Sequence, residues 1–162
     1  MMDQRPSSLS SQDLIQFAGE HLRYEIEMLY GVSRLIKEGR ADGVIYNALL
    51  ESFVLHTSVI LDFFYKLPMN PQEAKATHYI RDLEDWRQAL PPYDKYFIRF
   101  NKKRNREVMH LSYDRLKVEW VEKVWDFTRL NVQLRKIIDL FLTKADPALL
   151  HPKLSELKGN IF

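Results

Sequence analysis

The sequence predicts an all-α protein, a four-helix bundle with a long connection between its second and third helices and a short C-terminal tail. Glycine makes up only 5 of the 162 residues, so few tight turns are expected. Apolar residues recur at helical spacing over long stretches, and prolines gather near their ends. An apolar content of 46% is enough to build one core in a chain of this length.

We expect three parts along the chain: a disordered lead over 1–10, a helical bundle domain over 11–144, and a tail over 145–162 that docks on the bundle. The first helix should run from about Ser11 to Lys37. Ser10 or Ser11 can cap it, Asp13 lies in its first turn, and Gly39 stops it.

The second helix should run from about Val44 to Leu67, and it is apolar on nearly all sides, which predicts a central position. Its one polar stripe either faces water or partly lines a polar pocket beside the basic stretch described below. His56 lies on an apolar side and is expected to be a hydrogen-bonded core histidine. The stripe consists of Asn47, Glu51, Ser58 and Asp62.

The connection from Pro68 to Pro92 should hold a short helix at about Gln72 to Gln88, anchored by Leu83 and Trp86. Proline is tolerated in a first helical turn, so the third helix is expected to open at Pro91 and Pro92. The fourth should run from Lys117 to about Lys144. The leucines at 149, 150, 154 and 157 predict that the tail docks as a short turn.

Composition excludes several classes of protein. Cysteine is absent, which removes disulfides, thiolate metal sites and cysteine nucleophiles and is typical of a reducing compartment. The first 13 residues contain no apolar run, so we expect no signal peptide. Glu51, His56 and Asp62 interrupt the most apolar stretch, so we expect no membrane span and a cytoplasmic protein.

The stretch from Lys95 to Arg115 is the main functional signal. It opens with six basic residues and no acid, in a chain with a formal net charge of only +2. Such a run supplies affinity for phosphates, although most basic runs are solvated helix faces. The six residues are Lys95, Arg99, Lys102, Lys103, Arg104 and Arg106.

Arg106, His110 and Asp114 follow at i, i+4 and i+8, which is one face of an unbroken helix. A histidine can transfer protons near neutral pH, an arginine can hold a phosphate oxygen, and an aspartate can fix a histidine tautomer. These roles would suffice for metal-independent cleavage of RNA, in which the 2′-hydroxyl attacks the adjacent phosphate. We expect no cofactor and no metal for this chemistry.

Arg104, Asn105 and His110, near the end of one long helix of a four-helix bundle, resemble the R-x4–6-H signature of the HEPN superfamily. The segments 47–53 and 105–115 also resemble a set of uncharacterised bacterial helical proteins. In that set the segment starts at Asn105, which makes Arg106 the alternative partner of His110.

The resemblance implies a homodimer in which two motifs share one cleft, and either a metal-independent RNase of toxin, defence or RNA-processing systems or a protein that only binds nucleotides or partners. It implies that Arg104 and His110 are catalytic and that Asn105 supports them. The candidate catalytic residues are therefore Arg104, Arg106, His110 and Asp114, and the candidate RNA- or nucleotide-binding residues are Arg99, Lys102, Lys103, Asn105 and Arg115.

Parts of the sequence also fit three other classes of protein. A nucleoside-triphosphate pyrophosphohydrolase of the all-α type needs two acidic pairs on facing helices to hold Mg²⁺. The sequence offers one acidic cluster, Glu119, Glu122 and Asp126, and no matching pair on another predicted helix. A bundle metal site could use His21, His56 and His110, which chance placement explains equally well. The non-enzymatic alternative is a dimeric helical module that binds a protein partner, and it needs no chemistry from His110.

Overall fold

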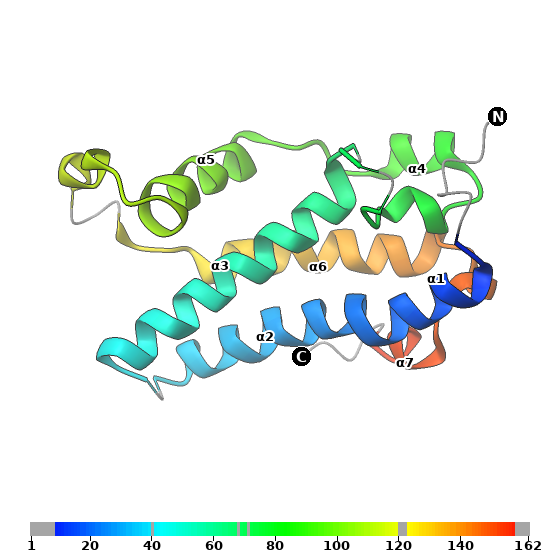
Figure 1. Cartoon of the computed structure of the whole chain (residues 1–162), viewed down its shortest axis with the longest axis horizontal. Helices are drawn as coiled ribbons and strands as arrows, with labels where there is room; N and C mark the ends of the chain where they lie inside the picture. Colours follow the sequence, from blue (N-terminus) through cyan, green and yellow to red (C-terminus); the bar gives the residue numbers. More distant parts are fainter. Residues whose placement is uncertain (1–8, 40, 68, 71, 120–122, 158–162) are drawn as a thin grey trace.

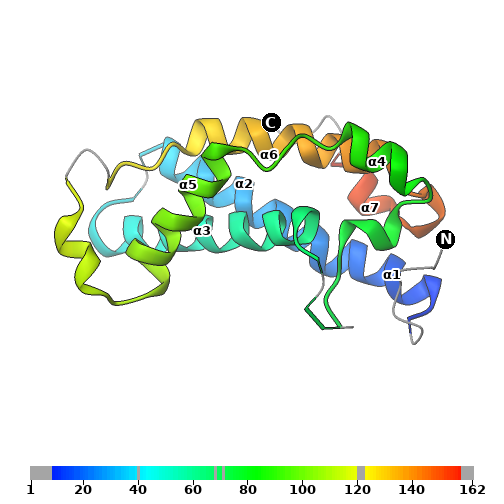
Figure 2. The same ribbon diagram turned by 90° about the horizontal axis from the view of Figure 1, so that it is seen from above.

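The computed structural model describes residues 9–39, 41–67, 69–70, 72–119 and 123–157. It confirms the all-α prediction: these ranges contain helices and helical turns, and no strand beyond a single isolated bridge between Ile80 and Ala145. Figures 1 and 2 show α2, α3 and α6 running along the length of the molecule, with α5 beside one end and α4 and α7 at the other.

The first helical segment consists of α1 (Ser11–Phe17), the π turn η1 (Ala18–Leu22) and α2 (Arg23–Lys37). The predicted helix from Ser11 to Lys37 therefore has the right bounds, with one π turn inside it. A capping box opens it: Asp13 N donates to Ser10 Oγ at 3.1 Å, and Ser10 N donates to Asp13 Oδ2 at 2.7 Å. Gly39, with φ of 65°, ends it.

Helix α3 (Gly43–Tyr65) lies beside α2, but only its second half is in the core. All of its buried residues fall between Phe53 and Phe64, whereas Val44 is 85% exposed. The prediction that this helix is central therefore holds for its second half and is wrong for its first two turns. By length and composition alone, α3 is the one helix in the described part of the chain that could cross a membrane, a property that core helices share.

The connection after α3 contains a 3₁₀ turn, η2 (Ala76–Tyr79), and α4 (Leu83–Ala89). The predicted helix from Gln72 began too early, because Asp82 caps α4 by accepting from the amides of Glu84 and Asp85 at 3.1 and 3.0 Å. Leu83 and Trp86 are buried, as predicted for its anchors.

Helix α5 (Lys95–Arg104) continues into a second π turn, η3 (Asn105–Met109). The predicted start at Pro91 and Pro92 was wrong, because Asp94 is the cap. Its Oδ1 accepts from Tyr96 N at 2.8 Å and from Phe97 N at 3.1 Å.

A 3₁₀ turn, η4 (Tyr113–Lys117), precedes α6 (Phe127–Lys144). The predicted start of this helix at Lys117 was wrong by about ten residues. Asp126 caps α6 by accepting from Arg129 N at 2.9 Å, and Trp125 just before it is buried against Phe100 at 5.8 Å between ring centroids.

The last helical elements of the described part of the chain are η6 (Pro147–Leu149) and α7 (Pro152–Ser155). Leu149, Leu150 and Leu154 are buried in the main core, so this segment packs on the bundle. His151, which caps α7, lies against Gly19 of η1.

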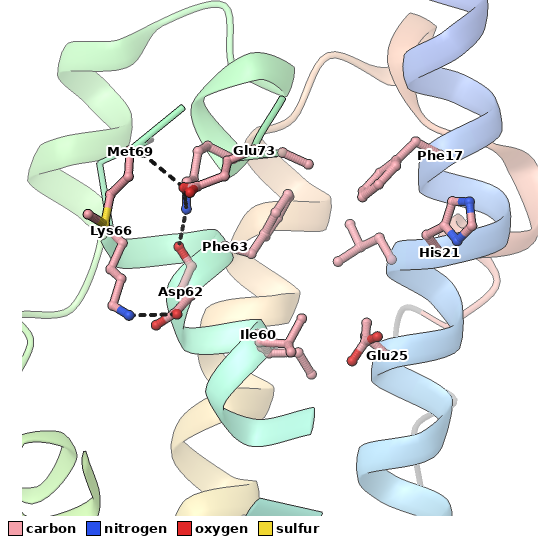
Figure 3. A pocket seen from close by; sticks show the side chains of 13 residues that line it. Phe17, His21, Glu25, Ile60, Asp62, Phe63, Lys66, Met69 and Glu73 are labelled. Atoms are coloured by element: carbon pink, nitrogen blue, oxygen red, sulfur yellow. Dashed lines mark hydrogen bonds and ion pairs between the residues drawn. The ribbon is translucent and has the colours of Figure 1, made fainter. Parts of the chain in front are cut away.

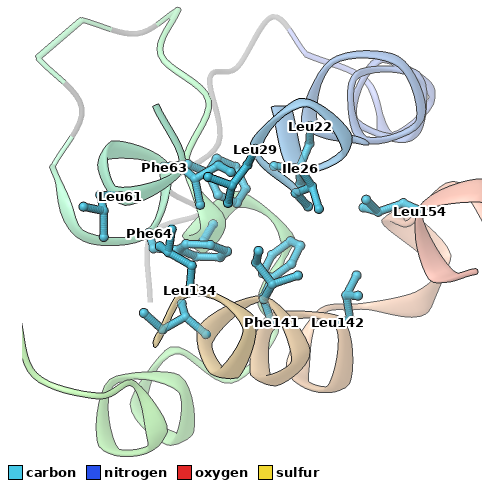
Figure 4. Packing of buried hydrophobic residues seen from close by; sticks show 14 of the residues in the cluster. Leu22, Ile26, Leu29, Leu61, Phe63, Phe64, Leu134, Phe141, Leu142 and Leu154 are labelled. Atoms are coloured by element: carbon cyan, nitrogen blue, oxygen red, sulfur yellow. The ribbon is translucent and has the colours of Figure 1, made fainter. Parts of the chain in front are cut away.

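Aromatic rings fill the centre of the core (Figure 4). Phe141 of α6 lies 5.5 Å from Phe63 and 5.6 Å from Phe64 of α3, measured between ring centroids, and Tyr79 and Trp86 complete the cluster at 5.8 and 6.3 Å. Most of these pairs meet edge to face, an arrangement that aromatic quadrupoles favour. The core thus joins α3, α6 and the connection, and it leaves the first turns of α3 and the outer face of α5 exposed.

Candidate functional site

Helix α5 presents one apolar and one basic face. Phe97 and Phe100 are buried, which fixes the rotation of the helix on the bundle. Lys95, Arg99 and Lys102 are exposed and stand at i, i+4 and i+7, so they form one row, here called the basic face. Within the described part of the chain, no acid pairs with any of the three.

The remaining cations of the stretch have partners. Lys103 Nζ lies 2.8 Å from Glu107 Oε2 and 4.7 Å from the centroid of a Trp125 ring, and Arg106 Nη2 lies 2.8 Å from Glu107 Oε1. Arg104 donates to Asn105 Oδ1 from Nε and Nη2 at 3.0 and 2.9 Å. The half-buried Glu107 therefore pairs with both Lys103 and Arg106, and its single negative charge offsets one of their two positive charges.

Arg115, a predicted RNA- or nucleotide-binding residue, donates to two backbone carbonyl groups. Its Nε donates to the carbonyl oxygen of Arg106 at 3.2 Å and to that of His110 at 3.1 Å. These bonds close the end of η3 onto η4, so the guanidinium fixes the turn that carries His110.

The common face that Arg106, His110 and Asp114 would share on an unbroken helix does not form, because the helix ends at Met109. His110 has extended backbone angles (φ −127°, ψ 133°), and its N–H donates to Asn105 O across the π turn at 3.1 Å. The imidazole is exposed, and it makes no hydrogen bond or ion pair with any residue that the structure describes.

Asp114 does not pair with His110 either, and its partner is Lys117. It pairs with Lys117 at 2.8 Å, and the hydrogen bond and charge of that lysine hold its pKa below the ordinary value. Arg106 contributes in the same direction from further away. The described part of one chain therefore does not assemble an arginine, a histidine and an aspartate around one point, and their catalytic roles stay predictions.

A groove of about 700 Å³ lies beside the basic stretch, between the start of α3, η3 and the segment that leads into α6. Asn47 and Glu51 line it, which confirms that part of the polar stripe of α3 faces a pocket here. Ser58 does not, because it is buried and donates to Val54 O at 2.7 Å. The lining of this groove, called the α5 groove, is Tyr46, Asn47, Leu50, Glu51, Glu107, Val108, Arg115, Val118, Lys123, Val124, Trp125 and Phe127.

The α5 groove combines aromatic and charged groups. Tyr46 and Phe127 are half-buried, and Trp125 is buried. Aromatic surfaces next to cations can stack a nucleobase and hold its phosphates. Sequence reasoning missed this combination because Tyr46 and Phe127 are far apart in the chain and each has the spacing of an ordinary core residue.

The alternative metal sites find no support in the geometry. Among the residues that the structure describes, no three histidine or acidic side chains stand close enough to hold a metal ion. His56 is buried and its Nδ1 lies 2.7 Å from Glu25 Oε2, which confirms the prediction of a hydrogen-bonded core histidine. Of the acidic cluster, Glu119 is exposed, Asp126 caps α6 and Glu122 lies outside the described residues.

Comparison of the chain with protein-family models, with curated proteins and with solved structures found no match.

Proposed function

We propose that this protein binds RNA or a nucleotide through the basic face of α5 and the α5 groove, which is lined by residues of η3, the turn that directly follows α5. The observation that carries the proposal is the row of Lys95, Arg99 and Lys102, three exposed cations that no acid of the described chain neutralises. Cations left free in this way can replace condensed counterions on a phosphate backbone. The aromatic residues of the groove would then contact bases.

The salt dependence of binding tests the proposal. For a single strand, each phosphate contact adds about 0.7 to the slope of log K against log salt, so replacing all three cations by Gln should lower the slope by about 2. At ~0.1 M salt this corresponds to about a hundredfold loss of affinity for an oligoribonucleotide.

A charge-matched control is Arg34→Gln, Lys37→Gln and Lys136→Gln, three exposed cations on α2 and α6. It changes the net charge equally but should leave the slope nearly intact. An equal loss in both triple variants would mean that only net charge matters, and the basic face would not be the site. Lys103→Gln should weaken binding less than the loss of one cation of the basic face, because Lys103 is paired with Glu107.

We further propose a HEPN-like topology for the four long helical segments 11–37, 43–65, 95–109 and 127–144, with two copies forming the active unit. Their number and order support it, as does the position of Arg104, Asn105 and His110 at the end of the third segment. In such a dimer the exposed imidazole of His110 would meet an arginine of the second copy. It would move the proton as the 2′-hydroxyl attacks phosphorus and the 5′-oxygen leaves.

The cleavage step is tested with mixed RNA in EDTA. Wild-type protein should cut, and His110→Ala should not cut while its RNA affinity stays nearly unchanged, because the role of His110 is proton transfer. Arg104→Gln and Arg106→Gln then identify which arginine acts. Intact RNA with wild-type protein would refute cleavage and leave the binding proposal standing.

The second candidate is a non-catalytic dimeric module that binds a protein partner. The exposed apolar residues of α3 favour it: Ile45, Leu55 and Val59 are 63, 51 and 41% exposed. Sedimentation at tens of micromolar, a range typical for weak dimers, should show a dimer that Leu55→Glu disrupts. Leu116→Glu, an equally apolar exposed position on η4, is the matched control. A dimer without RNA or nucleotide binding at low salt would favour this candidate.

A further inference from the structure

A second cleft of about 550 Å³ lies away from α5, and it shares no lining residue with the α5 groove. Its walls are the segment from α1 to α2, the second half of α3, Met69 and residues 73–75 (Figure 3). Leu22, Ile60 and Phe63 give it an apolar floor. Its volume is that of an ordinary small-molecule site.

The two lysines of this cleft are neutralised by its own acids. Lys66 Nζ lies 2.6 Å from Asp62 Oδ2, and Lys75 Nζ lies 3.1 Å from Glu73 Oε2. Lys75 is buried and also donates to the carbonyl oxygen of Asp62 at 3.3 Å. These pairs leave little positive charge to attract an anionic ligand.

Glu25 is the third acid that lines the cleft, and neither of the two lysines described above pairs with it. Its Oε2 is 2.7 Å from Nδ1 of the buried His56, whereas no residue that the structure describes donates to its Oε1. The contact with His56 fixes the position of the carboxylate and leaves Oε1 to accept a hydrogen bond from a ligand. Figure 3 shows Glu25 facing α3 across the cleft, below His21 and Phe17.

Aromatic rings stand next to this carboxylate. Phe17 and His21 pack at 5.2 Å between ring centroids, and Phe63 faces them from α3. Aromatic faces attract cations, most strongly where water is partly excluded. His21 belongs to the π turn η1, and π turns inside α-helices are frequent at functional sites.

We propose that this cleft binds an organic cation: a small molecule with a protonated amine on an apolar body. The ammonium donates to Glu25 Oε1 and lies near Phe17, while the apolar body covers Leu22, Ile60 and Phe63. The site is separate from the basic face, whose charge selects the opposite kind of ligand.

Two probes of matched shape test the proposal, 2-phenylethylammonium and 3-phenylpropanoate, which carry the same ring on the same short chain with opposite charge. Each is titrated into the ¹⁵N-labelled full chain at pH 7 and followed by amide NMR. The amine should shift amides of 17–25 and 59–66 saturably, and the carboxylate should not. Glu25→Gln should weaken amine binding at least tenfold, because a charge-assisted hydrogen bond is lost.

Glu20→Gln is the matched control: Glu20 is an exposed acid of the same π turn that does not line the cleft, so binding should be unchanged. Since Glu25→Gln also removes the partner of His56, Phe17→Leu provides a second variant that keeps the apolar floor and loses the ring. It should weaken binding about two- to fivefold. Equal binding of both probes, wild-type affinity in Glu25→Gln, or shifts confined to α5 would each overturn the proposal.

Discussion

Gly19 in the π turn η1 and Gly31 in α2 form a controlled pair for testing how the C-terminal segment packs. A Cβ on Gly19 would lie 2.5 Å from Cγ and 2.8 Å from Cδ2 of His151, closer than a real Cβ approaches. A Cβ on Gly31 would meet no atom within 4 Å. Both glycines are helical, so the gain in helix propensity of up to about 1 kcal/mol on changing to alanine is common to both.

The difference in free energy of unfolding between Gly19→Ala and Gly31→Ala therefore reports the contact with His151 alone. Overpacking costs about 1–3 kcal/mol, so Gly19→Ala should be less stable than Gly31→Ala by about that amount. Gly31→Ala should itself be up to about 1 kcal/mol more stable than wild type. For a chain of this size, 1 kcal/mol corresponds to about 2–4 °C in Tm.

Urea unfolding followed by circular dichroism measures the free energy of unfolding, with equal m-values confirming that the unfolding transition itself is unchanged. His151→Ala should relieve part of the cost of Gly19→Ala in a double-mutant cycle. Equal stability of Gly19→Ala and Gly31→Ala would refute the packing of α7 on η1.

Three further outcomes are expected. Phe141→Ala should lower the free energy of unfolding by about 3–5 kcal/mol, because its ring is the centre of the aromatic core, and a smaller loss in urea unfolding would contradict that position. Asp94→Ala should cost about 1 kcal/mol, and Asp94→Asn much less, because an amide oxygen can still cap the two amides. Burial, and secondarily Asp126, raises the pKa of Tyr96 to about 12 from 10.0, so the unfolded chain ionises first. Stability should then fall as pH rises from about 10 toward 12 and fall less in Tyr96→Phe, as measured by unfolding at fixed urea.

The bounds of the first helical segment were predictable from the sequence. The capping box of Ser10 and Asp13 lies next to the helix it starts, so the bounds of the first segment were right. The start of α6 was not, because the residues before Asp126 also have helical apolar spacing. Trp125 leaves that pattern to pack on Phe100, a contact between distant parts of the chain that spacing cannot show.

The sequence predicted which region holds the candidate site, but not which of its side chains contact each other. The basic run and its amphipathic helix follow from the periodicity of the sequence, and so does the basic face. Which cations of the run have an acidic partner depends on Glu107, which contacts both Lys103 and Arg106. The alignment of Arg106, His110 and Asp114 is lost because the helical run stops at Met109, before two of the three residues, and apolar spacing did not show that end.

The π turn η1 also indicates where the chain can accept the insertion or deletion of a residue. An α-helix turns by about 100° per residue, so an added residue normally rotates everything beyond it away from its neighbours. A π turn absorbs the extra residue within one turn, and Leu14 before η1 and Ile26 after it are both buried in the same core. Single-residue insertions and deletions should therefore be tolerated at η1 and η3 and disrupt the core elsewhere in these helices. Because each of the two turns borders a cleft, the lining of the clefts can change in length while the bundle keeps its register.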